Sequence, residues 1–161
     1  MIRITDQYFW NVVFIFFFLG LVTMAVIILD TEAHIAYTDL ELFDFILISL
    51  ASFRLIRLFV YDGMTKFFRE QFYDAKITKV GKVTLYKPAR GPRRTISDLM
   101  GCPWCFGVWA AAVVTFFYLL TPLAYFPVFL LAIASVATFL QLLINMIGWK
   151  AEQLKKEMEG K

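Results

Sequence analysis

The sequence is poor in the side chains that carry most metal and nucleophile chemistry. It has one His and two Cys among 161 residues. It contains no Gly-rich phosphate loop, no helical pair of His ligands and no recognisable Ser-His-Asp set. These shortages argue against ordinary enzymatic chemistry, so we expect a non-enzymatic protein with no catalytic residue and no cofactor.

Charged residues are also absent from long stretches of the chain. The sequence is 60% hydrophobic, contains 18 Phe and has a mean hydropathy of +0.69. Soluble domains are roughly half apolar, and a soluble chain of this length could not bury so much Phe and Leu. The apolar residues form long runs instead of recurring at helix or strand spacing, which predicts an all-α integral membrane protein.

Four apolar runs predict four transmembrane helices in a single membrane domain covering 1–161. The expected spans are about 8–29, 42–60, 104–121 and 123–149, against a hydrocarbon core of about 30 Å. The first run is longer than a signal-peptide core and lacks a cleavage site, so we interpret it as retained. The Thr121-Pro122 turn makes the last two spans an antiparallel hairpin, and the long fourth span must tilt or project.

The charges between the spans predict which side of the membrane each loop occupies. The segment after the first span is acidic and lacks Lys and Arg; its acidic residues are Asp30, Glu32, Asp39, Glu41 and Asp44. The loop at 61–101 is basic, with Lys66, Arg69, Lys76, Lys79, Lys82, Lys87, Arg90, Arg93 and Arg94, and Lys residues recur in the tail at 150–161. Basic loops stay in the cytoplasm. We therefore predict a multi-pass protein of the inner (cytoplasmic) membrane with both termini cytoplasmic.

The basic loop contains two further patterns. Apolar residues at helical spacing predict a helix that either lies in the membrane interface or packs into the core; they are Met64, Phe67, Phe68 and Phe72. Beyond them, apolar and polar residues alternate around Gly81 and predict a small β-hairpin. The basic charge suits anionic lipid headgroups, whereas nucleic acid is not expected because the stacking aromatics and reading motifs are missing.

Two arginines flaw the second predicted span. Arg54 and Arg57 share a helix face, and Arg54 lies about 9 Å inside the cytoplasmic end. One interpretation is that both side chains extend to the headgroups. The other is a polar cluster, in which an arginine pairs with Asp62, with Asp98 or with a lipid phosphate. The candidate set for the cluster or the phosphate is Arg54, Arg57, Asp62, Arg69, Arg93 and Arg94.

The two cysteines flank a Pro-Trp pair in GCPWCFGVW, where the third span begins. Pro103 suits the first turn of a helix, Thr95 with Asp98 or Ser97 could cap it, and Trp104 and Trp109 suit the interface. Three roles remain open for Cys102 and Cys105. They are small packing residues, or one half of a metal site that a second subunit completes, or a redox dithiol that is activated by the helix start and by Arg93 and Arg94. If they carry chemistry, we expect Cys102, at the helix entrance, to be the more reactive thiol and Cys105 to lie one turn deeper in apolar surroundings.

The stretches FRLIRLFVYDGMTKFFRE and LMGCPWCFGVWAA together resemble a family of small bacterial and phage membrane proteins of unknown function, one member of which is called a sporulation protein. The resemblance covers roughly Leu40 to Asn145. It matches Arg54, Arg57, Asp62 and Arg69 to an Arg-rich motif, and Cys102, Cys105 and Trp109 to a second motif. It implies a membrane fold and no mechanism.

Two functional hypotheses follow. The first is a membrane protein whose basic cytoplasmic face binds anionic lipid or a protein partner, including a second copy of itself. The second is a membrane thiol-disulfide or inter-subunit metal protein that uses Cys102 and Cys105.

Overall fold

The structure, a computed structural model, describes residues 4–33, 39–77 and 83–159. The long helices are α1 (Ile4–Glu32), α2 (Leu42–Ile56), α5 (Pro103–Leu120) and α6 (Tyr125–Glu159), and the short ones are α3 (Lys66–Glu70) and α4 (Pro92–Gly101). Two strands, β1 (Asp74–Ile77) and β2 (Val83–Tyr86), pair antiparallel with Ile77 opposite Val83. The predicted all-α class with a small β-hairpin is confirmed. His34, Lys79, Gly81 and Lys82 lie outside the described residues.

Three helical segments are long and apolar enough to cross a membrane: Gln7–Glu32, Pro103–Leu120 and Pro122–Met158. They correspond to the first, third and fourth predicted spans. The second predicted span is helical as well, but α2 stops after 15 residues and continues as a π-helical turn, Arg57–Tyr61. The arginines that flaw this span therefore lie where the helix changes its hydrogen bonding, a common feature of functional sites.

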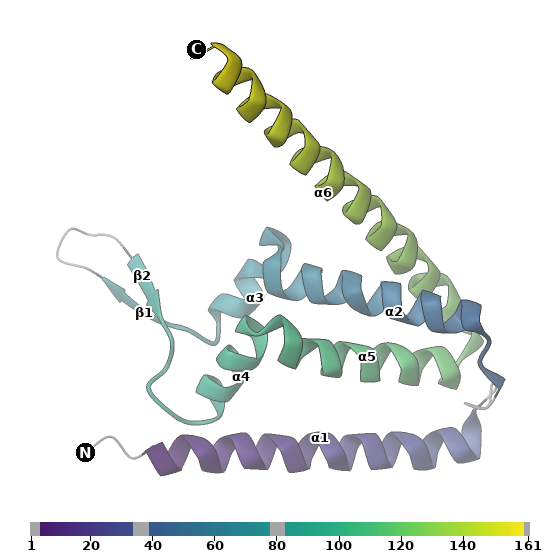
Figure 1. Cartoon of the computed structure of the whole chain (residues 1–161). Helices are drawn as coiled ribbons and strands as arrows, with labels where there is room; N and C mark the ends of the chain where they lie inside the picture. The colour runs from purple at the N-terminus through teal and green to yellow at the C-terminus, as the bar shows by residue number, and fades with distance from the viewer. Residues whose placement is uncertain (1–3, 34–38, 78–82, 160–161) are drawn as a thin grey trace.

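The long helices are arranged with α5 between α1 and α2 (Figure 1). The start of α1, α4 and the β-hairpin lie towards one end, which we call the hairpin end, and the turn between α5 and α6 lies towards the opposite end. The most extensive packing joins α2 to α6 and α2 to α5, while α1 packs mainly on α5 and α4. α2 is therefore the centre of the bundle.

Small residues let α2 and α5 approach each other closely. Ala51 of α2 is completely buried and Ala110 of α5 nearly so. At Gly107 a Cβ atom would lie only 3.2 Å from Cδ1 of Ile56, so the two helices approach each other closely there. The core continues towards the opposite end through Leu47, Ile48, Val114, Tyr118, Leu119, Val128 and Ala132.

A polar link joins α2 and α5 at the opposite end. The Tyr118 hydroxyl donates a hydrogen bond to Oδ1 of Asp44, and Oδ2 of Asp44 accepts the backbone N–H of Glu41, 3.0 Å away, at the start of α2. The Asp44 carboxylate therefore caps the start of α2 and joins α2 to α5.

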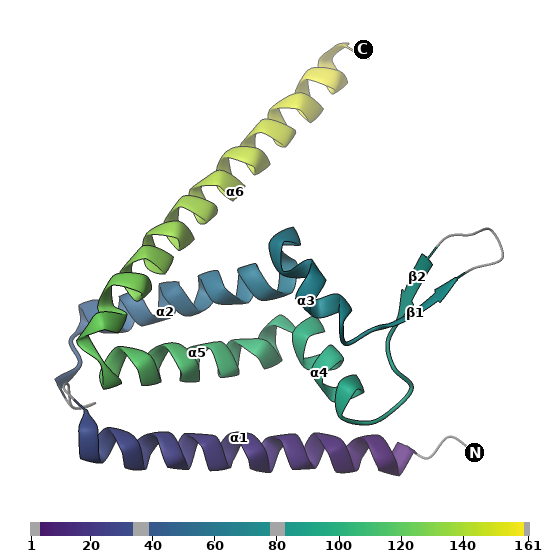
Figure 2. The same cartoon turned by 180° about the vertical axis from the view of Figure 1, so that it is seen from behind.

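Only the first part of α6 packs on the bundle. Val128, Ala132 and Ser135 are buried one turn apart, whereas every residue from Phe139 to Met158 is exposed. Figures 1 and 2 both show α6 diverging from α2 along its length. Its 35 residues make a helix of about 52 Å, far longer than a bilayer core of about 30 Å.

The expected interfacial helix is shorter than the sequence pattern indicates. A 3-10 turn, Gly63–Thr65, leads into α3, which ends at Glu70 because the chain must turn into β1. Phe68 and Phe72 pack edge to face, and Phe68 also meets Phe59 of the π-helical turn. Met64 and Phe67 remain exposed, so the apolar pattern divides between the bundle and the surface.

Candidate functional site

Polar and charged side chains gather at the hairpin end. The π-helical turn ends at Asp62, and the chain folds back so that Asp62 faces its own helix. Its carboxylate pairs with Arg54 at 3.2 Å, and its backbone carbonyl accepts a hydrogen bond from Arg69 at 3.2 Å. The Thr65 hydroxyl donates to the carbonyl of Leu58, one of the acceptors freed as the helix ends. The pairing of Asp62 with an arginine is thus present, and Arg54 is the arginine.

Arg57 has different surroundings from Arg54. Its guanidinium lies over the ring of Tyr61, 5.8 Å from the ring centroid. Its Nε is buried and has no hydrogen-bond partner, and no carboxylate of the described residues pairs with it. A buried donor without an acceptor is unfavourable by about 1–3 kcal/mol. Arg57 is therefore a cation with an unused donor.

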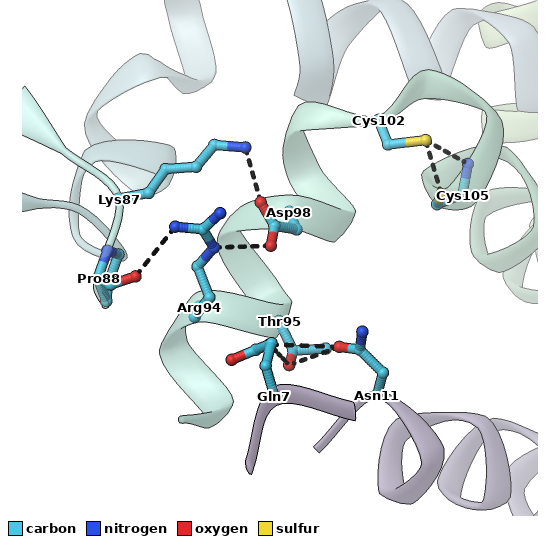
Figure 3. A network of polar contacts seen from close by, with 9 residues as sticks. All are labelled: Gln7, Asn11, Lys87, Pro88, Arg94, Thr95, Asp98, Cys102 and Cys105. Atoms are coloured by element: carbon cyan, nitrogen blue, oxygen red, sulfur yellow. Dashed lines mark hydrogen bonds and ion pairs between the residues drawn. The ribbon is translucent and has the colours of Figure 1, made fainter. Parts of the chain in front are cut away.

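A second cluster joins α4 to the segment after β2 (Figure 3). The carboxylate of Asp98 accepts hydrogen bonds from Lys87 at 2.7 Å and from Nε of Arg94 at 2.8 Å, and Arg94 also donates to the carbonyl of Pro88. Partial burial acts to raise the Asp98 pKa, but the hydrogen bonds and charges of Lys87 and Arg94 outweigh it and hold the pKa below the ordinary 3.8.

Arg93 secures the base of the hairpin. Its guanidinium pairs with Asp74 of β1 at 3.3 Å and donates to the carbonyl of Gln71 at 2.9 Å. Arg93 and Arg94 are thus held within the loop. The expectation that these two arginines activate a thiol is not supported, because neither is among the causes of the Cys102 pKa shift.

The cysteines lie where α4 gives way to α5. Cys102 has an extended backbone and is the N-cap of α5: its sulfur accepts the backbone N–H of Cys105 at 3.3 Å, and Pro103 is the first helical residue. The expected caps were wrong, because Thr95 and Ser97 are buried inside α4 and Asp98 binds cations. The hydrogen bond from the Cys105 thiol, followed by backbone N–H groups of Cys105 and Trp104, lowers the Cys102 pKa.

The two sulfurs are 2.6 Å apart, and both cysteines are free thiols. Cys105 is exposed and Cys102 half-buried, so Cys105 does not lie in the apolar surroundings expected of it. Within the described ranges no group of three or more His, Cys, Asp or Glu side chains could hold a metal ion. A metal at this dithiol would need ligands from elsewhere.

The two tryptophans have different positions. Trp104 is 87% exposed beside the dithiol. Trp109 packs against α1, with ring centroids 6.2 Å from Phe17 and 4.7 Å from Phe18. Trp109 therefore contributes to the contact between α1 and α5.

Sequence reasoning missed a polar contact between α1 and α4. Gln7 donates to the Thr95 hydroxyl at 2.8 Å, and that hydroxyl donates to Oδ1 of Asn11 at 3.1 Å (Figure 3). The available signal was the spacing of Gln7 and Asn11, one turn apart at the start of an apolar run. Their partner on α4 could not be read from that spacing.

Comparisons with known proteins agree with the family resemblance. Residues 47–144, which include the Arg54 and Cys102 stretches, match the model of a family described as "Protein of unknown function (DUF1360)". UPF0713 protein YngL of Bacillus subtilis (strain 168) is 32% identical over 123 residues, 74% of this chain and 92% of YngL. Sporulation protein YjcA of the same organism is 35% identical over 105 residues, 62% of this chain and 89% of YjcA. No solved structure matches the chain.

Proposed function

The chain belongs to the DUF1360 family of proteins of unknown function, and on that premise we propose that it is a multi-pass protein of the cytoplasmic membrane whose basic face binds anionic lipid. The family description assigns no activity. One relative is named a sporulation protein, and that role is not transferred to this chain. The support comes from the helices and from the charges at the hairpin end.

Four crossings best reconcile the helices with the charges. α1, α5 and α6 have the length and composition of spans, and α2 with its π-helical turn, which packs on both α5 and α6, is the fourth. An even number of crossings puts both termini and the basic hairpin end in the cytoplasm, and it puts the acidic segment after α1 on the outer side. The divergence of α6 is then the tilt of a helix longer than the bilayer is thick.

The surroundings of Arg57 carry the proposal of lipid binding. Arg57 lies about 6 Å from the end of the π-helical turn, at the depth where lipid phosphates meet the hydrocarbon core. Asp62, Asp74 and Asp98 are already paired with cations. A lipid phosphate would pair with the Arg57 guanidinium, which no carboxylate of the described residues neutralises, through a charge-assisted hydrogen bond.

The apolar residues around this site suit the same depth. Tyr61, Met64, Phe67 and Trp104 are exposed near the hairpin end, and aromatic side chains favour the membrane interface. The remaining basic residues of the loop add about 1 kcal/mol each near an anionic membrane surface. Arg57 would thus hold one lipid while the loop attracts the anionic leaflet as a whole.

Lipid retention tests the proposal. Wild-type protein and the Arg57→Gln variant are purified from bacterial membranes in a mild detergent, and the bound phosphatidylglycerol is measured by native mass spectrometry. Arg57→Gln should retain several-fold less phosphatidylglycerol, while Lys156→Gln, which removes an exposed cation of the α6 tail, should retain the wild-type amount. Equal retention by both variants would rule out a lipid site at Arg57.

A second candidate function is reversible dithiol-disulfide exchange at Cys102 and Cys105. It is supported by the 2.6 Å separation of the sulfurs, since disulfide formation requires only a small further approach to about 2.05 Å. The N-cap position of Cys102 also stabilises a thiolate, the form that attacks in such exchange.

A further inference from the structure

Both cysteines line a cavity between α1 and α5. The cavity has a volume of about 450 Å³, and its other walls include Asn11, Phe14, Phe18, Thr95, Asp98 and Trp109. Phe18 and Trp109 also border a second cavity of about 310 Å³, which extends along the same helices to Ile28. The two cavities share these walls and follow one another along α1 from Asn11 to Ile28, about 26 Å along the helix, and we treat them as one groove.

The groove is polar at one end and apolar along the rest. Its polar side chains, including the dithiol, gather near the start of α5, whereas the far part is lined only by aliphatic and aromatic residues such as Leu21, Ile28 and Phe117. Such a groove fits a molecule with a small polar head and a long apolar tail.

The charges at the polar end favour a neutral head. Asp98 is the charged residue that lines the groove there, and both of its oxygens are already bound by Lys87 and Arg94. An anionic headgroup would therefore lie beside a carboxylate, with no unpaired cation among the residues that line this end of the groove. A phosphate is poorly matched to this end of the groove.

The Asn11 amide gives the polar end a hydrogen-bond donor. Its Oδ1 accepts from Gln7 and Thr95, and within the described part of the chain its nitrogen contacts no acceptor. Figure 3 shows that nitrogen directed away from Gln7 and Thr95. A neutral carbonyl oxygen is its natural partner, and the rings of Phe14, Phe18 and Trp109 offer flat walls for a ring.

We propose that this groove binds an isoprenoid quinone, with its ring beside Cys102 and Cys105 and its tail along α1 and α5, and that the quinone oxidises the dithiol. The Cys102–Cys105 S–S bond forms as both S–H bonds break. The two electrons and two protons pass to the quinone carbonyls, which become the hydroxyls of the quinol. The inference rests on the second candidate function, dithiol-disulfide exchange, and on the membrane placement of the bundle.

The test uses the reduced, purified full-length protein in lipid nanodiscs without oxygen. The probe is a fully substituted benzoquinone with a decyl tail, which has no free ring position for thiol addition. Absorbance follows quinone loss, and mass spectrometry follows the mass change on disulfide formation. We expect one quinone to be reduced per disulfide formed, with a rate that saturates as quinone concentration rises. No reduction should occur in a Cys102→Ser, Cys105→Ser variant.

Three matched variants locate the quinone. Ala112→Phe fills the apolar part of the groove, Asn11→Leu removes the donor, and Ala137→Phe adds the same ring to the exposed surface of α6. The first two should raise the half-saturating quinone concentration about tenfold, equivalent to about 1.4 kcal/mol, and Ala137→Phe should leave it unchanged. A rate linear in quinone and equal in all variants would mean random collision and overturn the proposal.

The water-soluble oxidant diamide distinguishes failure of the quinone site from failure of dithiol-disulfide exchange. If diamide forms the disulfide and the quinone does not, dithiol exchange stands and the quinone site is wrong, and the groove is then a channel for lipid acyl chains. If neither oxidant forms the disulfide, dithiol exchange falls together with the quinone site.

Discussion

The hydrogen bond between Tyr118 and Asp44 should be measurable as a contribution to stability. Tyr118 is almost fully buried in α5, and its hydroxyl is the group that reaches the Asp44 carboxylate on α2. Tyr118→Phe keeps the ring in the core and removes only that donor. The perturbation therefore isolates one contact between the two central helices.

The loss of stability in Tyr118→Phe depends on the hydrogen bonds that Asp44 keeps. Hydrogen bonds to charged groups contribute about 1.5–3 kcal/mol. Asp44 keeps its second hydrogen bond, from the Glu41 backbone, so we expect the lower end of this range. At about 2–4 °C per kcal/mol, the scaling of globular domains of this size, the midpoint of thermal unfolding should fall by about 3–6 °C.

Thermal unfolding of the detergent-solubilised protein measures this shift. Tyr125→Phe is the matched control, since Tyr125 is 46% exposed and its ring lies 6.3 Å from that of Tyr118. Combining Tyr118→Phe with Asp44→Asn should cost less than the sum of the two single changes, because both remove the same contact. An unchanged midpoint for Tyr118→Phe, or strict additivity, would refute the reasoning.

Three further predictions concern the hairpin end and the helix contact. The folded-state pKa of Asp98 is depressed, so its cluster stabilises the protein above the ordinary carboxyl pKa, and this stabilisation is lost as pH falls through the folded-state pKa. Asp98→Asn should therefore abolish the part of the acid-induced loss of stability that wild-type protein shows below about pH 4. We expect this part to be under about 1 kcal/mol, because the pair is half-exposed. Site-resolved alkylation should find Cys102 more reactive than Cys105, with a midpoint below the ordinary thiol value of 9.0, and Cys105→Ala should raise that midpoint. Gly107→Val should lower the free energy of unfolding by about 1–3 kcal/mol through collision with Ile56, and Ile56→Ala should recover part of the loss.

The sequence was sufficient to predict the helices because long apolar runs carry their own signal. The α-helical class and the small hairpin could both be read from composition and spacing. The π-helical turn at Arg57 could not, because a single extra residue per turn leaves no mark in a hydrophobic pattern. At that turn Arg54 pairs with Asp62, while Arg57 lies over Tyr61.

Contacts between distant elements were the least predictable part of the site. The partners of Asp44 and Asn11 depend on how each helix is rotated about its axis and where it crosses its neighbour. The cysteine motif was recognised, but Cys105, which was expected to lie deeper in apolar surroundings, is exposed. Its position one turn further along α5 was taken as burial.

Membrane integration with four crossings is the claim on which the lipid and quinone sites both depend, and labelling across the membrane tests it most directly. Single cysteines replace Glu32, Gln71 and Glu152 in a Cys102→Ser, Cys105→Ser background, and intact cells are treated with a membrane-impermeant maleimide. We expect labelling at position 32 alone, with positions 71 and 152 labelled only after the cells are opened. If α2 does not cross the bilayer, positions 71 and 152 will be labelled from outside together with position 32, and that result would contradict the four-span topology.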